Sequence, residues 1–225
     1  MELVYQGKTK DVYNNGDGTL TLKLKDDATG KDGVFDPGEN TVGLTIDGLG
    51  RESLRVSEYY FKLLEKKGIP THFIACDVEK ATMRVKPARA FGKGLEFVCR
   101  VRADGSFVKR YGAYVKHGEN LDFLVEVTIK DDGRGDPPLT EDTLTTLGIM
   151  TPEDFALCRK LTKEAAAIIN ENLAAKDLLL ADIKFEFGKS GDKILLMDEI
   201  SAGCMRVYKN DKIVEPMNLG IFILN

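Results

Sequence analysis

The 225-residue sequence is poor in the residues that most often bind metals or form disulfides. Its only histidines, His72 and His117, lie in no triad-like or metal-binding pattern, so imidazole catalysis is not expected. The four cysteines form no C-x-x-C pair, which argues against a zinc site or disulfide framework and favours a reducing compartment. Carboxylates, lysines and arginines are therefore the expected source of acid, base or metal chemistry.

Long apolar runs are missing too. None approaches the length of a membrane span, and the opening MELVYQGKTK lacks the apolar segment of a secretory signal. The formal net charge of -4 argues against duplex DNA or RNA as an obligate partner. With 43% hydrophobic residues, the chain can bury a substantial core in one large domain or two small lobes. These features predict a cytoplasmic protein with no membrane or nucleic-acid partner.

The order of predicted elements is strands, helix, strands, helix, hairpin, which is typical of an α+β fold. The first helix is predicted within residues 53–70, where Gly68 suits the position just past its end and Pro70 prevents continuation. The second is predicted from Thr151 to about Ala175. The Gly- and Asp-rich segment 26–52 is expected to be an irregular loop.

Strands are predicted elsewhere, among them residues 94–102, residues 122–130 and a hairpin built from LLLADIKFEFG and KILLMDEIS. We expect a β-rich N-terminal lobe over residues 1–86 and a mixed α/β C-terminal lobe over residues 87–225.

The hairpin strand LADIKFEFG concentrates charge on one face. Asp182, Lys184 and Glu186 point one way, because successive side chains in a strand alternate. The returning strand brings Asp198 to the same region. Mg²⁺ is typically held by one or two carboxylates plus phosphate and water oxygens, so Glu186 and Asp198 are candidate ligands. The alternative is an exposed cross-strand ladder of ion pairs, which would contribute little to stability.

Two further segments carry basic residues at turns. In YQGKTK, Gly7 allows a tight turn from which Lys8 and Lys10 could reach phosphate oxygens, although no Walker A pattern occurs. In RVRADGSFVKR, guanidinium groups and Ser106 flank an Asp-Gly turn and could form a phosphate cradle. The alternative for each segment is a solvated surface hairpin.

Together these segments resemble the SAICAR synthetase family, the phosphoribosylaminoimidazole-succinocarboxamide synthases of purine biosynthesis. The resemblance covers most of the chain, and its order and rough spacing agree. It rests on five blocks: YQGKTKDVY, LEFVCRVRADGSFVKRYG, GDPPLTED, LLADIKFEFG, and LMDEIS followed by Arg206.

The resemblance implies a two-lobed fold with ATP in a cleft between the lobes. It implies an ATP-dependent carbon–nitrogen ligase that joins a carboxyaminoimidazole ribonucleotide to L-aspartate through an acyl phosphate, and it is compatible with a homodimer. The implied residues are Gly7, Lys8, Lys10 and Lys86 for ATP; Glu186 and Asp198 for Mg²⁺; Arg100, Ser106 and Arg206 for the ribonucleotide phosphate; and Lys184 and Asp182 beside the reacting carboxylate.

The chain also departs from the usual family pattern. It reads SAG at residues 201–203, where S-P-D is usual, and DGLGRESLRVS in place of an asparagine-rich segment. Two alternatives therefore stay open: a paralogous ATP-dependent carboxylate–amine ligase acting on a different substrate, and a nucleotide-binding protein of the same fold.

Overall fold

The computed structural model describes residues 1–224, which group into two compact units. The first unit contains Met1–Arg89, Glu199–Cys204 and the segment from Glu215 onward, and the second contains Ala90–Asp198 and Met205–Val214. This grouping differs from the division expected at residue 86 mainly at the C-terminal end, where two late segments belong to the first unit.

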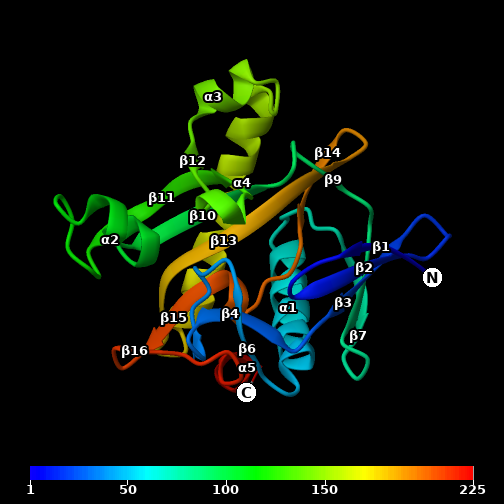
Figure 1. Ribbon diagram of the computed structural model, residues 1–225, viewed down its shortest axis with the longest axis horizontal. Helices are drawn as coiled ribbons and strands as arrows, with labels where there is room; N and C mark the ends of the chain where they lie inside the picture. Colours follow the sequence, from blue (N-terminus) through cyan, green and yellow to red (C-terminus); the bar gives the residue numbers. More distant parts are fainter. Residues whose placement is uncertain (225) are drawn as a thin grey trace. The chain divides into compact units, whose positions relative to one another are not determined.

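The first unit is built on a five-stranded sheet in the order β1-β2-β3-β8-β7 (Figure 1). Alternation in the stretch TLTLKLK produces β3, whose Leu22 and Leu24 are each 6% exposed. The strands of this sheet are β1 (Glu2–Gln6), β2 (Lys10–Asn14), β3 (Leu20–Leu24), β7 (Phe73–Asp77) and β8 (Thr82–Val85).

The expectation of an irregular loop over residues 26–52 is wrong. A three-stranded sheet forms there, with β4 (Asp27–Lys31) paired to both β5 (Val34–Phe35) and β6 (Val42–Thr45). A Cβ added to Gly43 would lie 2.4 Å from the backbone carbonyl carbon of Gly30. The glycines that indicated a loop are therefore needed for the close approach of two strands.

Helix α1 (Leu49–Lys66) supplies much of the first unit's core and begins four residues before the predicted start. Gly68 follows its C-terminal cap with φ of 87°, as predicted for that position. Phe61 is fully buried, and its ring stacks on that of Phe73 with centroids 5.6 Å apart. The short helix α5 (Leu219–Leu224) packs on α1, and the single turn η2 (Ala202–Cys204) completes the unit.

The second unit is built on an eight-stranded sheet with β13 (Leu179–Ser190) at its centre (Figure 1). The strand order is β12-β11-β10-β13-β15-β16, and β14 and β9 pair with other parts of β13. The remaining strands are β9 (Arg89–Ala90), β10 (Leu95–Arg102), β11 (Asn120–Ile129), β12 (Pro138–Leu139), β14 (Lys193–Met197), β15 (Met205–Lys209) and β16 (Lys212–Ile213).

Helix α4 (Pro152–Ala174) covers one face of this sheet. The Thr151 hydroxyl accepts a hydrogen bond from the backbone N–H of Asp154, and proline occupies the first turn, as the sequence predicted. Beneath α4 lie Ile183, Phe185 and Phe187 of β13, which are at most 2% exposed and confirm the predicted apolar face. The remaining short helices are α2 (Gly105–Tyr111), η1 (Asp132–Arg134) and α3 (Glu141–Thr146).

The long strands β10, β11 and β13 pair antiparallel, and this confirms the α+β class. Over residues 1–224, no helix is both long and apolar enough to cross a membrane.

Candidate functional site

The charged face of β13 is aligned with its neighbours by the strand register. Asp182 lies opposite Arg100 of β10 on one side and Arg206 of β15 on the other. Two residues further along β13, Lys184 lies opposite Val98, and Glu186 then lies opposite Glu96. Side chains at these alternating positions share one face of the sheet, the face opposite the buried aromatic side chains.

Asp182 is held between two arginines. Its carboxylate lies 2.7 Å from Nη1 of Arg100 and 2.9 Å from Nη1 of Arg206. Asp182 and Arg100 are 4% exposed and Arg206 is 8% exposed, so these ion pairs are largely removed from water. The alternative of an exposed ladder of ion pairs is therefore wrong for Asp182, because its ion pairs are buried. Removing one partner of a buried pair costs much more stability than removing one partner of an exposed pair.

Arg110 brings a third guanidinium group to the cluster around Arg100. The Glu126 carboxylate on β11 lies 3.0 Å from Nε of Arg100, and it also forms an ion pair with Nη2 of Arg110 at 2.7 Å. Three guanidinium groups, from Arg100, Arg110 and Arg206, thus face the two carboxylates of Asp182 and Glu126. Guanidinium groups gathered in a largely dry environment are typical partners of phosphate oxygens.

The turn after β10 brings a hydroxyl group to this cluster. Asp104 caps α2, and Gly105 adopts a left-handed conformation with φ of 48°. The Ser106 hydroxyl then accepts a hydrogen bond of 3.0 Å from Nη2 of Arg100. A Cβ added to Gly105 would lie 2.6 Å from Cζ of Arg206, so this guanidinium packs directly on the glycine.

Arg100, Ser106 and Arg206 are therefore gathered at one place. The alternative of a basic hairpin at this segment is wrong, because residues 105–111 form α2.

Lys184 is held by an acid that the motif analysis did not assign to a site. Its Nζ lies 2.9 Å from Oε1 of Glu96, while Oε2 of Glu96 accepts a hydrogen bond from Thr128 at 3.3 Å. Glu96 is 7% exposed. The alternation of β10 already placed Glu96 on the face of Arg100, but its pairing with Lys184 depends on the register between β10 and β13.

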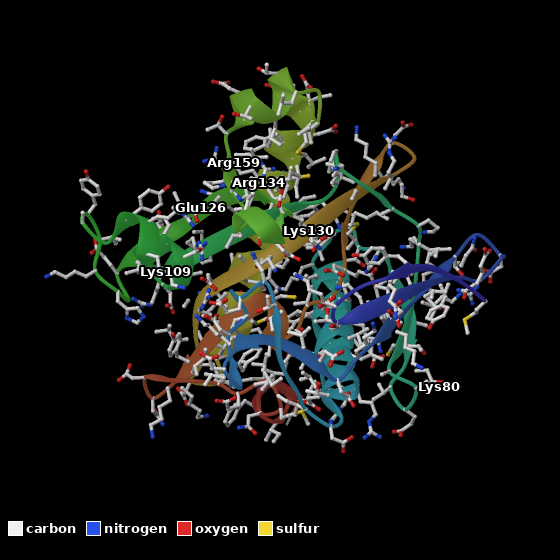
Figure 2. The ribbon with its side chains drawn as sticks, viewed as in Figure 1. Lys80, Lys109, Glu126, Lys130, Arg134 and Arg159 are labelled. Carbon is white, nitrogen blue, oxygen red and sulfur yellow. The ribbon has the colours of Figure 1, made fainter. Side chains whose placement is uncertain are left out.

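The two predicted metal ligands lie at the other end of the charged face. Oε1 of Glu186 lies 2.7 Å from Nζ of Lys130, another residue that the motifs did not single out. Lys130 is labelled in Figure 2. Asp198 follows Met197, the residue paired with Glu186, and adopts a left-handed φ of 74°. The described residues contain no group of three or more His, Cys, Asp or Glu side chains placed to hold a metal. Two carboxylates nevertheless suit Mg²⁺ when phosphates complete its coordination.

The four predicted ATP-binding residues belong to the first unit. The Gly7 N–H donates to the Lys10 carbonyl at 2.9 Å, and a Cβ on Gly7 would lie 2.7 Å from the same oxygen, so the tight turn needs glycine. Lys8 donates to the Asn40 carbonyl at 2.7 Å, and Lys10 pairs with Glu199. Lys86 donates to the Thr71 carbonyl at 3.3 Å.

Known proteins are similar to this chain in sequence and in architecture. A sequence model of the family described as SAICAR synthetase matches residues 3–218. The chain is 50% identical to the phosphoribosylaminoimidazole-succinocarboxamide synthase of Clostridium tetani, over 100% of both chains. It is 37% identical to the protein of the same name from Finegoldia magna, over 94% of this chain and 87% of that protein.

A solved structure of SAICAR synthetase (Type-2) in complex with ADP superposes on this chain with a TM-score of 0.81 at 30% identity. That superposition covers 93% of this chain and 86% of the other. The family match and both relatives extend over most of the sequence, which confirms the resemblance seen in its motifs. The chain belongs to the SAICAR synthetase family.

Proposed function

We propose that this protein is an ATP-dependent ligase of purine biosynthesis that joins carboxyaminoimidazole ribonucleotide to L-aspartate, forming SAICAR, ADP and phosphate. Full-length 50% identity to a synthase of that name is the observation that carries the proposal. The cluster of Arg100, Ser106 and Arg206 supports it, because a ribonucleotide substrate needs a site for its 5′-phosphate.

The reaction has to activate a carboxylate, which is a poor acyl donor because its leaving group would be oxide. Transfer of the γ-phosphoryl group of ATP to a carboxylate oxygen gives an acyl phosphate and ADP. The aspartate amine then attacks the acyl carbon and loses a proton. The new carbon–nitrogen bond forms as the carbon–oxygen bond to phosphate breaks, and inorganic phosphate leaves.

The side chains of β13 suit this chemistry. The Lys184 ammonium group would lie beside the reacting carboxylate and neutralise negative charge that develops during phosphoryl transfer. Glu96, 2.9 Å from Nζ, pairs with that ammonium group and fixes its direction. Asp182 would act through the arginines that it pairs with, because its carboxylate contacts Arg100 and Arg206.

Two cofactor roles are part of the proposal. Glu186 and Asp198 would hold Mg²⁺, which when bound neutralises phosphate charge. Gly7, Lys8, Lys10 and Lys86 would contact ATP. For Lys10 this requires an exchange of partners, because its ammonium group is paired with Glu199.

The test is a complete reaction containing ATP, Mg²⁺, carboxyaminoimidazole ribonucleotide and aspartate, with ADP and the coupled product followed together. ADP release that needs both other substrates is the expected result. Turnover only with a different amine would favour a paralogous ligase, whereas melting stabilised by ATP without turnover would favour a nucleotide-binding protein. Sedimentation of the same sample tests whether the chain is a homodimer.

Arg206→Ala provides the matching variant, with Arg102→Ala as its control. Arg102 lies on the same strand as Arg100 but donates to the Gly118 carbonyl at 3.1 Å. The Arg206 change is expected to raise the KM for the ribonucleotide, whereas the Arg102 change is expected to leave it within about twofold. An unchanged KM in the Arg206 variant would contradict the phosphate role.

A further inference from the structure

Asp104 makes more contacts than a helix cap needs. Its Oδ1 accepts the N–H of the first helical residue, Gly105, at 2.6 Å. Its Oδ2 accepts a second hydrogen bond from the hydroxyl of Tyr208, at 2.8 Å, and Nε2 of His117 lies 3.3 Å from Oδ1. Asp104 is 8% exposed, whereas the His117 side chain is 66% exposed, so the Tyr208 contact is the better shielded of the two long-range contacts.

Two side chains of strand β15 contact two consecutive residues of the turn, Asp104 and Gly105. Arg206 and Tyr208 are two positions apart on β15, so their side chains leave the same face of the strand. Tyr208 binds Asp104, and the Arg206 guanidinium packs on Gly105. The next residue, Ser106, receives the hydrogen bond from Arg100. Three consecutive residues of the turn are thus fixed by three side chains from two strands.

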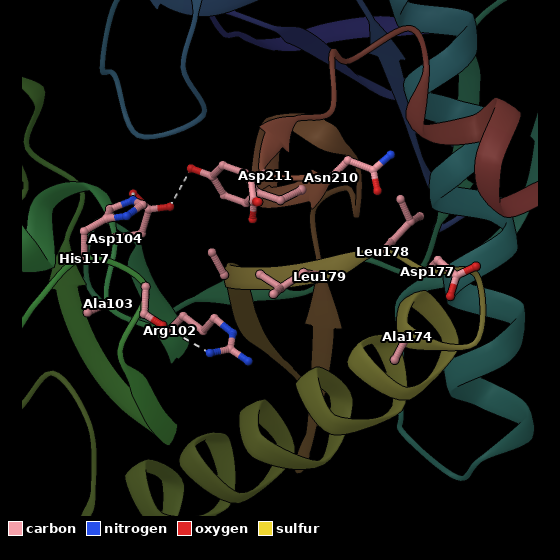
Figure 3. A pocket seen from close by; sticks show the side chains of 13 residues that line it. Arg102, Ala103, Asp104, His117, Ala174, Asp177, Leu178, Leu179, Asn210 and Asp211 are labelled. Carbon is pink, nitrogen blue, oxygen red and sulfur yellow. Dashed lines mark hydrogen bonds and ion pairs between the residues drawn. The ribbon is translucent and has the colours of Figure 1, made fainter.

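A cavity borders the turn on the side of Asp104. Asp104, His117 and Tyr208 line a cavity of about 810 Å³ in the second unit, and the cavity extends to Leu179 and Asp211. Figure 3 shows the Asp104 carboxylate at the wall of this cavity, with the dashed line that marks its bond to the tyrosine hydroxyl. Ala103 and Phe107 on either side are buried, but the Asp104 carboxylate itself borders this space, so its polar contacts help to set the orientation of the turn.

We propose that Tyr208 and Asp104 are positioning residues that hold the Gly105–Ser106 turn in place against Arg100 and Arg206 for binding of a phosphate monoester. The proposal rests on the phosphate role given to this cluster under the proposed function. Tyr208 acts only through Asp104, and neither residue is required to touch the substrate.

The protonation states suit this role. Burial, followed by the hydrogen bond to Asp104, raises the pKa of the Tyr208 hydroxyl above its ordinary value, so it remains a donor throughout the neutral range. Phenylalanine at position 208 would keep the ring and remove only the donor. Asparagine at position 104 would keep one oxygen acceptor, which cannot serve both the Gly105 N–H and the tyrosine hydroxyl as two carboxylate oxygens do.

The experiment measures ribose 5-phosphate and Mg-ADP binding by calorimetry, using the full chain. The variants are Tyr208→Phe, Asp104→Asn and the double variant, with Tyr114→Phe as the control because Tyr114 is 90% exposed. We expect each single variant to weaken ribose 5-phosphate binding about tenfold. The double variant should bind ribose 5-phosphate with the affinity of whichever single variant binds it less tightly, because both changes break the same contact. Mg-ADP binding should stay within twofold, as should both ligands in the control.

Two results would overturn the positioning role. One is ribose 5-phosphate binding within twofold of the unaltered protein in both single variants. The other is an equal weakening of Mg-ADP binding, which would indicate general loosening of the fold.

The same titrations separate this inference from the proposed function. A protein that binds ribose 5-phosphate in a Tyr208-dependent way, yet releases no ADP in the complete reaction, keeps the positioning role and loses the ligase activity. An unaltered protein that does not bind ribose 5-phosphate at all refutes the positioning role, whatever its turnover.

Discussion

Gly105→Ala is the most informative single substitution, because it should displace Arg206 from the cluster of Arg100, Ser106 and Arg206 while the protein still folds. The added methyl group would lie 2.6–2.7 Å from Cζ and both terminal nitrogens of Arg206, well inside contact distance. A guanidinium group can rotate away, so the fold should survive while Arg206 leaves its position. Alanine must also keep a φ of 48°, which costs about 1–2 kcal/mol for a residue with a Cβ.

The binding effect should exceed the stability effect. Loss of one hydrogen-bonding contact to a charged group costs about 1.5–3 kcal/mol, which corresponds to a rise of about 10- to 150-fold in the KM for the ribonucleotide. Asp182 would retain Arg100, 2.7 Å away, so its charge stays paired and the fold is not further weakened.

Gly118→Ala is the matched control. Gly118 also has a positive φ, 80°, but no atom lies within 4 Å of a Cβ placed there. It should show a similar loss of stability in urea unfolding and an unchanged KM. Equal KM values in the two variants would refute the assignment of Arg206 to substrate binding.

Three other predictions concern catalysis, metal and pH. Lys184→Ala should abolish turnover while the protein still folds, with some loss of stability because the buried Glu96 loses its partner. Lys189→Ala should not affect turnover, although Lys189 is similarly exposed on the same strand and is also paired with an acid. Normal rates in the Lys184 variant would remove Lys184 from the mechanism. Asp198→Asn should raise the Mg²⁺ concentration for half-maximal rate by about tenfold, without a large loss of stability, because asparagine tolerates a left-handed φ; an unchanged Mg²⁺ titration would exclude Asp198 as a ligand. Burial raises the pKa of the Cys99 and Cys158 thiols to about 12. Thiols of the unfolded chain lose their protons near pH 8.5, so the free energy of unfolding should fall as pH rises from about 9 towards 12. Urea titrations across that range should show a shallower fall for Cys158→Ala, and an identical slope would contradict the assignment.

The elements with regular local patterns could be predicted from the sequence. The alternation in LADIKFEFG predicted both faces of β13, since Ile183 and Phe187 need the core while Lys184 needs a polar face. Thr151 and Pro152 likewise predicted the start of α4 through capping chemistry that is complete within one turn.

The errors arose where long-range pairing decides the structure. The glycines of residues 26–52 have the composition of a loop, and only the approach of β6 to β4 shows why Gly43 is required. The helical turn after β10 was hidden for a related reason, because an Asp-Gly pair is as typical of a hairpin as of a capped helix.

The partners of the site residues were out of reach for the same reason. The hydroxyl of Tyr208 and the carboxylate of Asp104 come from positions 104 residues apart, and no local signal links them. Alternation in β10 placed Glu96 on the same face as Arg100. Its contact with Lys184, which lies 88 residues later in the chain, depends on the register between β10 and β13.

The division of the chain into units has a consequence for biosynthesis on the ribosome. The first unit contains residues made early, yet the backbone groups of Ile200 that bond to Ser57, and helix α5 that covers α1, are made only after most of the second unit. The second unit is translated almost whole in between. We therefore expect nascent chains to carry an amino-terminal portion in which part of α1 stays uncovered until α5 has been made.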